Sequence, residues 1–223
     1  MASTETDAGA PIARSPIARS PIARKAPVRA HAGWEVSAAR SEGALRLSDL
    51  TPLSKVLVRG APGSTVGQHV GCAFGSTRRD ADGSLVVGTG PDEWLILSPA
   101  GSGARVTAAL EGTGGAGSAG GGLITVIDMT HGSVVLRIAG ANAHRVLEKL
   151  CAIDLSDRVT PNGSCFSSSV ARLRSTVIRD DLGPERSYLI ESDRSSGQYL
   201  FDAILDAGAE LTIDVDGYPE KEI

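Results

Sequence analysis

Two short stretches of this sequence hold side chains that could take part in acid–base chemistry. Asp92 and Glu93 are neighbours, and Asp128, Thr130 and His131 form a compact polar cluster. A histidine beside a carboxylate can act as a general base with its orienting partner, and two carboxylates can share the roles of acid and base. Each stretch therefore offers a hypothesis of catalysis that its surroundings must support.

The first stretch, VVGTGPDEWLIL at 86–97, is the most specific text in the sequence. Its glycines and Pro91 favour a turn, and the apolar residues on either side favour strands, so we predict two strands around a turn. Adjacent strand residues point to opposite faces, so Asp92 and Glu93 cannot both reach one substrate atom. We favour a turn-capping Asp92 and a solvated or salt-bridged Glu93 over a catalytic pair.

The second stretch lies in LITVIDMTHGSVVLRIAG at 123–140, whose β-branched runs around His131-Gly132 predict a hairpin. No nucleophile motif of the GxSxG type accompanies Asp128 and His131, and such residues often form local hydrogen bonds in turns. A structural role is therefore favoured over a catalytic base. If the chain keeps a folate or substrate pocket, we expect Glu93, Asp128 and His131 to line it, because their motifs lie at strand ends.

Motifs for metals, nucleotides and flavins are missing from the sequence. The glycine-rich run EGTGGAGSAGGG at 111–122 lacks the Gly-Lys-Ser/Thr ending of a phosphate loop, and no GxGxxG opens a helix after a strand. The three cysteines, Cys72, Cys151 and Cys165, are unevenly spaced and read as buried thiols, and the four histidines lack ligand spacing. We therefore assign no catalytic, cofactor-binding or metal-binding residue.

The composition narrows the class of protein. Hydrophobic residues make up 41% of the 223 residues, enough for one substantial core or two small ones. A net charge of −4 argues against a nucleic-acid surface. Because the apolar runs are far shorter than the ~20 residues of a membrane span and no signal-peptide core is recognisable, we expect a cytoplasmic protein without membrane partners.

Composition also predicts the domain organisation. Residues 1–33 carry PIARS at 11–15 and 16–20 and PIARK at 21–25, and this spacing of prolines excludes a regular helix or central strand. We predict a flexible basic arm, either docked on an acidic partner surface or simply solvated. The remaining predicted boundaries are a first half at 34–110, a glycine-rich linker at 111–122, a second half at 123–216 and a polar tail at 217–223.

Both halves show antiparallel strand signals with helices between them, which indicates an α+β fold and not a dinucleotide-binding one. Strands are expected within 34–38, 44–47, 55–60, 85–87 and 94–97, and later near 169–173, 175–179 and 187–192. Ser64 is expected to cap a short helix over 65–70. Further helices are expected at 104–110, between 141 and 153, and at 197–208.

Five segments together resemble the gamma subunit family of heterotetrameric sarcosine oxidase, in order and over roughly residues 19–206. GPDEWL and the D-x-[ST]-H-G motif are the most specific of them. The segments are RSPIA at 19–23, LTPLSKVLVRG at 50–60, GPDEWLIL at 90–97, IDMTHGSVVLRIAGANAHRVLEKLCAIDL at 127–155 and DRSSGQYLFDAIL at 193–205.

The resemblance implies an aminomethyltransferase or folate-binding-domain fold with two ferredoxin-like halves and antiparallel sheets. It also implies a non-redox assembly subunit, with alpha, beta and delta subunits as partners and no cofactor of its own. In that family the complex uses FAD, FMN, NAD and tetrahydrofolate to demethylate sarcosine to glycine and to pass on the methyl carbon. The alternative is a stand-alone folate-binding or aminomethyltransferase-like protein.

Overall fold

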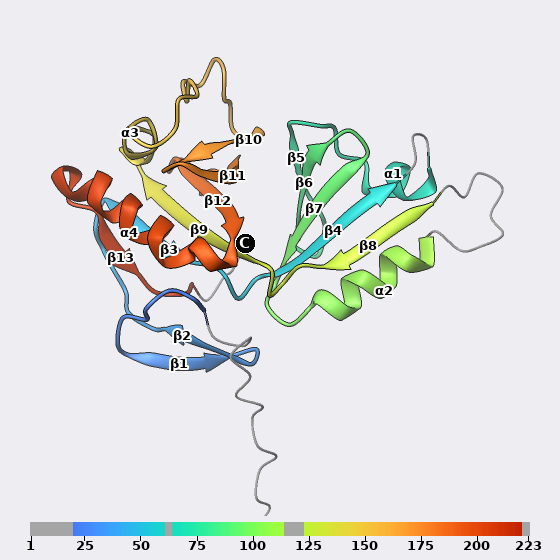
Figure 1. The fold of residues 1–223 in the computed structure, drawn as a ribbon, viewed down its shortest axis with the longest axis horizontal. Helices are drawn as coiled ribbons and strands as arrows, with labels where there is room; N and C mark the ends of the chain where they lie inside the picture. The colour runs from blue at the N-terminus through green and yellow to red at the C-terminus, as the bar shows by residue number, and fades with distance from the viewer. Residues whose placement is uncertain (1–19, 61–63, 114–122, 220–223) are drawn as a thin grey trace, which may run out of the picture.

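Two β-sheets stand face to face, and each carries helices on its outer side (Figure 1). The computed structural model describes residues 20–60, 64–113 and 123–219. One hydrophobic cluster fills the space between the sheets, and two others lie between each sheet and its helices. The arrangement is the predicted α+β fold with mainly antiparallel sheets.

The larger sheet has six strands, and all neighbours are antiparallel except the last pair, which is parallel. Helices α3 (Ala143–Leu147) and α4 (Gly197–Gly208) cover its outer face, with short 3₁₀ turns η2 (Arg194–Ser196) and η3 (Ala209–Leu211) at the ends of α4. In spatial order the strands are β10 (Cys165–Val170), β11 (Leu173–Arg179), β12 (Ser187–Asp193), β9 (Ser133–Gly140), β3 (Leu45–Asp49) and β13 (Asp214–Asp216).

The smaller sheet has five antiparallel strands. Helices α1 (Thr65–Val70) and α2 (Gly103–Thr113) cover its outer face, and Ser64 caps α1 as predicted by accepting the Gly67 N–H. A separate hairpin joins β1 (Val28–His31) and β2 (Trp34–Ser37). In spatial order the five strands are β5 (Thr77–Arg79), β6 (Leu85–Gly90), β7 (Glu93–Ser98), β4 (Ser54–Gly60) and β8 (Ile124–Asp128).

The predicted hairpin around Asp92 is confirmed, since β6 and β7 pair across it. Along β7, Trp94 and Ile96 join the core under the helices, whereas Leu95 and Leu97 join the core between the sheets. This alternation follows from the period of two in a strand. It places Glu93 on the face that looks toward the other sheet.

The predicted hairpin at 123–140 is wrong. β8 pairs with β4 in the five-stranded sheet, whereas β9 pairs with β12 and β3 in the six-stranded sheet. The His131-Gly132 segment is therefore a crossing between sheets and not a hairpin turn. Two apolar strands around a polar turn give the same sequence signal in both cases, because periodicity does not identify a strand's neighbours.

The two sheets do not coincide with the predicted halves at 34–110 and 123–216. β3, from the first half, lies in the six-stranded sheet, and β8, from the second, lies in the five-stranded sheet. The predicted linker begins inside α2, which runs to Thr113, and its residues 114–122 lie outside the described part of the chain. Because each sheet takes a strand from the other half, neither half could form its sheet alone.

Both predicted terminal segments are more ordered than the sequence indicated. Within the predicted arm, Ile22 is buried and residues 28–31 form a strand, whereas residues 1–19 lie outside the described part. Within the predicted tail, Tyr218 is 1% exposed and its N–H donates to the Ser37 carbonyl at 2.8 Å. Both segments pack against the hairpin β1–β2, which the sequence only half predicted.

Smaller differences concern one helix and one strand. α3 ends at Leu147, well before the predicted limit near residue 153. β10 begins at Cys165 and ends at Val170, so the strand predicted near 169–173 lies earlier in the chain. None of the helices in the described ranges is long and apolar enough to cross a membrane.

Candidate functional site

A cavity of about 290 Å³ opens between the inner faces of the two sheets. β4 and β7 contribute one wall, and β11 and β12 contribute the other. Its lining combines apolar side chains, three carboxylates and one guanidinium. The residues that decide its chemistry are Leu57, Leu95, Met129, Glu93, Glu191, Asp193 and Arg174.

Glu93 lines this cavity, but its carboxylate already has partners within the five-stranded sheet. It accepts from the Arg59 guanidinium at 2.5 Å and from the Thr89 hydroxyl at 2.9 Å. Asp92 lies in the turn with φ +55°, and its carbonyl accepts the Gly60 N–H at 3.0 Å. Glu93 is therefore salt-bridged, as favoured from the sequence, and Asp92 takes part in the turn through its backbone.

Glu191 is the carboxylate that the sequence reasoning missed. Burial raises the pKa of Glu191, and hydrogen bonds from Ser133 and Thr176 and the charge of Lys55 oppose that rise. A carboxyl group with a raised pKa can exchange protons nearer neutral pH. The sequence signal was a glutamate directly after the apolar run Tyr-Leu-Ile of the strand SYLIESD, a position that is also typical of a strand end.

Asp128 and His131 do not join Glu93 in the cavity. The Asp128 carboxylate accepts the Thr130 N–H at 2.8 Å and lies against Gly103, the first residue of α2. The His131 ring stacks on the Trp34 ring, with centroids 5.0 Å apart. Of the three expected pocket residues, only Glu93 lines the cavity, while Met129 between the other two also does so.

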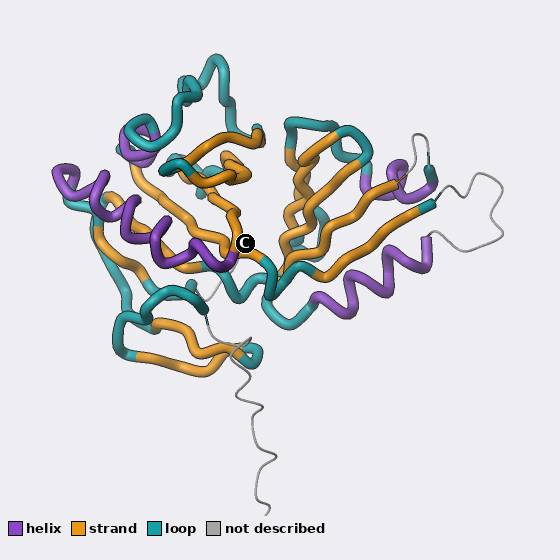
Figure 2. Tube along the Cα trace, in the orientation of Figure 1, coloured by secondary structure: helices purple, strands orange, loops and turns teal. Residues whose placement is uncertain are grey.

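The segment around Asp128 holds together the two places where the chain crosses between sheets (Figure 2). The Met129 N–H donates to the Lys55 carbonyl at 2.7 Å, and the Lys55 N–H donates to the Thr130 hydroxyl at 3.1 Å. A further bond joins the Leu50 N–H to the Val135 carbonyl at 2.8 Å. The polar cluster noted in the sequence is therefore the structural joint between the sheets.

Lys55 is fully buried at this joint. Its Nζ donates to the carbonyls of Thr51 at 2.6 Å and Leu53 at 2.9 Å. Burial lowers the pKa of Lys55 to about 7, although the charges of Asp49 and Glu191 oppose the change. The lysine at the start of an apolar strand, SKVLVRG, was the available signal, but such a lysine usually lies at a solvated strand end.

An ion-pair cluster links the two sheets at another point. The Asp180 carboxylate accepts from Arg79 of β5 at 2.6 and 2.7 Å and from Arg137 of β9 at 2.8 Å. Arg137 also donates to the Asp180 carbonyl and to the Ser187 hydroxyl. Burial lowers the pKa of Arg137, and the Asp180 charge opposes this shift. The three residues are at least 43 positions apart in the sequence, so no local motif marked them.

The cysteines and the side chains that could bind a metal ion show no reactive centre in the described part of the chain. Cys151 and Cys165 are buried and Cys72 is partly buried, and all three are free thiols. Burial raises the pKa of Cys165 to about 11, so this thiol is a poor nucleophile at neutral pH. Within residues 20–60, 64–113 and 123–219, no group of three or more His, Cys, Asp and Glu side chains could hold a metal ion.

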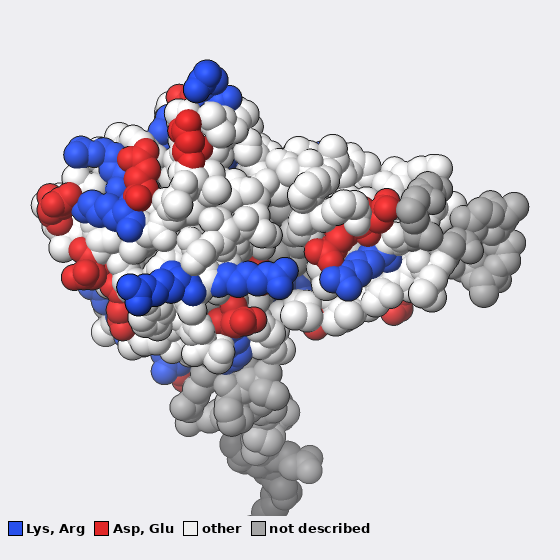
Figure 3. All heavy atoms as spheres, turned by 45° about the horizontal axis from the view of Figure 1, so that its top comes forward, with Lys and Arg blue, Asp and Glu red and all other residues white. Residues whose placement is uncertain are grey.

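One part of the outer surface carries few charges. Figure 3 shows uncharged surface over the upper middle of the view, with charged side chains at the left and right and a row of lysines or arginines across the middle. Several large apolar side chains are exposed on the described surface, among them Phe74 at 65% and Leu123 at 86%.

We predict a small effect for Glu93→Gln. Arg59 is 65% exposed, so its ion pair with Glu93 should contribute no more than about 1 kcal/mol to the free energy of unfolding. Urea denaturation measures the change, with Glu185→Gln as the matched control. Glu185 binds Arg46 through both oxygens, and both side chains are less than one third exposed. A loss for Glu93→Gln larger than that for Glu185→Gln would contradict the small contribution expected of the exposed Arg59–Glu93 pair.

Comparison with known proteins adds an independent observation. The model of the GCVT N-terminal domain family matches residues 75–220, which is more than half of the chain. The chain is also 29% identical over 153 residues to the sarcosine oxidase subunit gamma of Arthrobacter sp. That alignment covers 64% of this chain and 71% of the relative.

Two solved structures share the fold. A chain of heterotetrameric sarcosine oxidase from Corynebacterium sp. U-96, in complex with pyrrole 2-carboxylate, gives a TM-score of 0.66 at 22% identity, over 78% of this chain and 89% of that chain. Aminomethyltransferase T of the glycine cleavage system from Bartonella henselae gives a TM-score of 0.67 at 15% identity. That match covers 88% of this chain and 57% of the aminomethyltransferase chain. The expected aminomethyltransferase-like fold is confirmed. The chain belongs to the GCVT N-terminal domain family and is homologous to the gamma subunits of sarcosine oxidase.

Proposed function

We propose that this chain is the gamma subunit of a heterotetrameric sarcosine oxidase and assembles with alpha, beta and delta subunits. In this proposal the complex demethylates sarcosine oxidatively to glycine and passes the methyl carbon to tetrahydrofolate. FAD, FMN and NAD are bound by the other chains, and this chain contributes to assembly. The observation that carries the proposal is the homology to gamma subunits over most of both chains.

The surface of the five-stranded sheet supports an assembly role. β8 lies at the open edge of that sheet, and Leu123 beside it and Ile127 within it are 86% and 44% exposed. Natural proteins usually cover or charge an open, apolar sheet edge, because it can pair with other chains. A partner subunit seated on this edge would bury both side chains.

The start of α2 supports placing the nucleotide cofactors on other chains. A helix that begins soon after a strand can bind a phosphate with its free N–H groups. In this chain the Asp128 carboxylate lies at the start of α2, so close that a Cβ added at Gly103 would stand 2.8 Å from it. That carboxylate is stabilised by the positive end of the helix, and a phosphate beside it would be repelled.

The alternative, a stand-alone folate-binding protein, fits the cavity less well. Glu93, Glu191 and Asp193 give it three carboxylates against the one guanidinium of Arg174. The glutamate tail of tetrahydrofolate is anionic, so this lining does not suit it. Calorimetric titration of tetrahydrofolate into the full-length chain should therefore give no binding heat, and a saturable signal lost in Arg174→Ala would favour the alternative.

Co-expression tests the proposed function directly. The tagged full-length chain, expressed with candidate alpha, beta and delta subunits, should elute with them as one flavin-coloured complex. Purified alone, it should be colourless and should consume no oxygen with sarcosine. Failure to retain any flavoprotein chain, or flavin bound to the chain alone, would contradict the proposal.

A further inference from the structure

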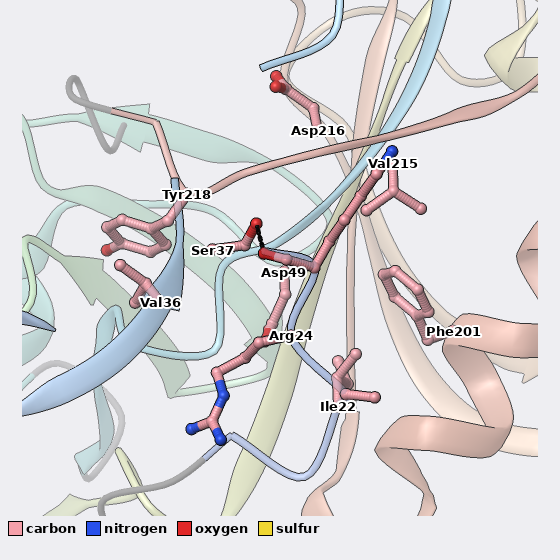
Figure 4. A pocket seen from close by; sticks show the side chains of 11 residues that line it. Ile22, Arg24, Val36, Ser37, Asp49, Phe201, Val215, Asp216 and Tyr218 are labelled. Carbon is pink, nitrogen blue, oxygen red and sulfur yellow. Dashed lines mark hydrogen bonds between the residues drawn. The ribbon is translucent and has the colours of Figure 1, made fainter. Parts of the chain in front are cut away.

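Residues 20–24, Ser-Pro-Ile-Ala-Arg, lie in a groove between β2, β3 and α4 (Figure 4). The Ile22 side chain is 3% exposed and belongs to the core under α4, on the side of the segment where Phe201 lies. Pro21 lies directly against Gly197, where an added Cβ would stand 2.8 Å from the proline ring. Pro21 and Ile22 are therefore fitted closely to the first turns of α4.

Polar contacts fix the other three residues of the segment. The Ser20 hydroxyl donates to the Asp49 carboxylate at 2.5 Å, and the Ala23 N–H donates to the Gln198 side-chain oxygen at 2.7 Å. The Arg24 guanidinium pairs with the Glu35 carboxylate at 2.5 Å. Burial raises the pKa of Asp49, and the Ser20 hydrogen bond opposes that rise, so the hydroxyl stabilises the buried carboxylate.

The groove is almost filled by this segment. The cavity that remains beside it measures about 20 Å³, room for about one water molecule. Four of the five side chains contact the groove, whereas Ala23 is held through its N–H. The groove therefore discriminates among sequences at the other four positions, where a change would leave a gap, a clash or an unpaired polar group.

The same five residues occur a second time in the chain. Residues 15–19 also read Ser-Pro-Ile-Ala-Arg, and they directly precede the bound segment. Residues 10–14 read Ala-Pro-Ile-Ala-Arg and lack the serine that contacts Asp49. One copy is bound, a second carries every side chain that the groove contacts, and a third lacks one of them.

We propose that this groove is a binding site for the sequence Ser-Pro-Ile-Ala-Arg and that residues 15–19 occupy it in a second register of the same chain. In that register residues 20–24 leave the groove and lengthen the connection to β1 by five residues. The groove keeps the contacts of the five residues in both registers, but the second register loses the Lys25–Asp214 ion pair, because Ser20 would then follow the bound copy. The loop is also five residues longer, although its closure cost grows only slowly with length.

The consequence is a free arm whose length differs between the two registers. The chain before the groove is five residues shorter when residues 15–19 are bound than when residues 20–24 are bound. The groove stays filled in both states, so the core under α4 keeps its cover. Residues 10–14 do not provide a third register, because Ala10 would leave Asp49 without its hydroxyl partner.

Limited digestion with trypsin reports the register in the full-length chain, because Arg19 and Arg24 end the two copies and Lys25 follows the second. In the register of the structure, cleavage after Arg19 should dominate over cleavage after Arg24 and Lys25. Ile22→Ala should reverse this preference by a factor of about 30 or more, the ratio expected when a buried isoleucine loses its side chain. Ser20→Ala, a milder change, should move the preference in the same direction.

Variants of the other copies supply the controls. Ile17→Ala alone should leave the melting temperature unchanged, whereas Ile17→Ala added to Ile22→Ala should lower it further and abolish the reversal of cleavage. Ile12→Ala added to Ile22→Ala should change neither measurement. The proposal is overturned if Ile22→Ala and the Ile17→Ala/Ile22→Ala double variant melt and cleave alike, or if Ile12→Ala has the effect expected of Ile17→Ala.

Discussion

Replacing Asp180 with alanine should lower the free energy of unfolding by about 3–5 kcal/mol, the cost of leaving a buried charge without its partner. Arg137 has 7% of its side chain exposed, and Asp180 is the carboxylate that pairs with it. Without Asp180 the guanidinium keeps the Ser187 hydroxyl and one carbonyl, but no negative charge. Urea denaturation followed by the fluorescence of the buried Trp34 and Trp94 measures the loss.

The size of this effect comes from the position of Asp180 between the sheets. Its carboxylate is 8% exposed and binds Arg79 of the five-stranded sheet and Arg137 of the six-stranded sheet. Removing the Asp180 carboxylate therefore breaks a contact between the two sheets. It also leaves the buried charge of Arg137 without its partner. Trp34 lies between the sheets and Trp94 lies under the helices of one sheet, so their fluorescence follows two different parts of the core. We expect both tryptophans to show the same decrease in the free energy of unfolding.

Two further variants separate this explanation from a general intolerance of substitution. Asp80→Ala removes a carboxylate from an ion pair whose side chains are 36% and 40% exposed, so it should cost no more than about 1 kcal/mol. Arg137→Met added to Asp180→Ala removes the stranded charge and should recover part of the stability. Equal losses for Asp180→Ala and Asp80→Ala would contradict the proposed role.

What the sequence predicts well is local. The turn at Asp92, the Ser64 cap and the helix at 197–208 each depend on residues within one short window, and all three are present. The alternation along β7 also follows from local pattern, since Trp94 and Leu95 point to opposite cores. These features need no knowledge of which strands are neighbours.

What the sequence does not predict is which distant segments meet. The strands on either side of His131 read as a hairpin, yet they belong to different sheets. Asp128 and Glu93 come from equally distinctive motifs, but only Glu93 lines the cavity. Glu191 and Lys55, whose pKa values are shifted by burial, look like ordinary strand residues, because their burial depends on the packing of one sheet on the other.

Lys55 leads to the second large expected effect, which is a dependence of stability on pH. Burial lowers the pKa of this lysine to about 7, whereas an unfolded chain holds the proton up to about pH 10.4. Between these values the unfolded state binds more protons than the folded state. Raising the pH therefore stabilises the fold, because the proton that folding must release is already gone.

The neighbouring charges do not reverse this sign. Asp49, Glu191 and Asp128 raise the pKa of Lys55 and Arg194 lowers it, and the value of about 7 already includes them. The pKa values of Asp49 and Glu191 are themselves raised by burial, so these carboxyls favour folding at low pH and lose that contribution as they ionise. The effect of these two carboxyls on the pH dependence of stability is therefore opposite in sign to that of Lys55. Comparing a Lys55 variant with the natural chain separates the two effects.

We expect the free energy of unfolding to rise by about 2 kcal/mol between pH 7 and pH 9 because of Lys55, and Lys55→Met should remove this rise. The matched control is Lys149→Met, which replaces a lysine whose side chain is 38% exposed and paired with Glu210. That variant should keep the rise of the natural chain.

Urea denaturation at each pH gives the slopes, and a Lys55→Met chain whose stability still rises like the control would show that Lys55 keeps its proton when buried. Its Nζ would then be an ammonium with two carbonyl acceptors at 2.6 and 2.9 Å, and the joint between the sheets would depend on the charges of Asp49 and Glu191.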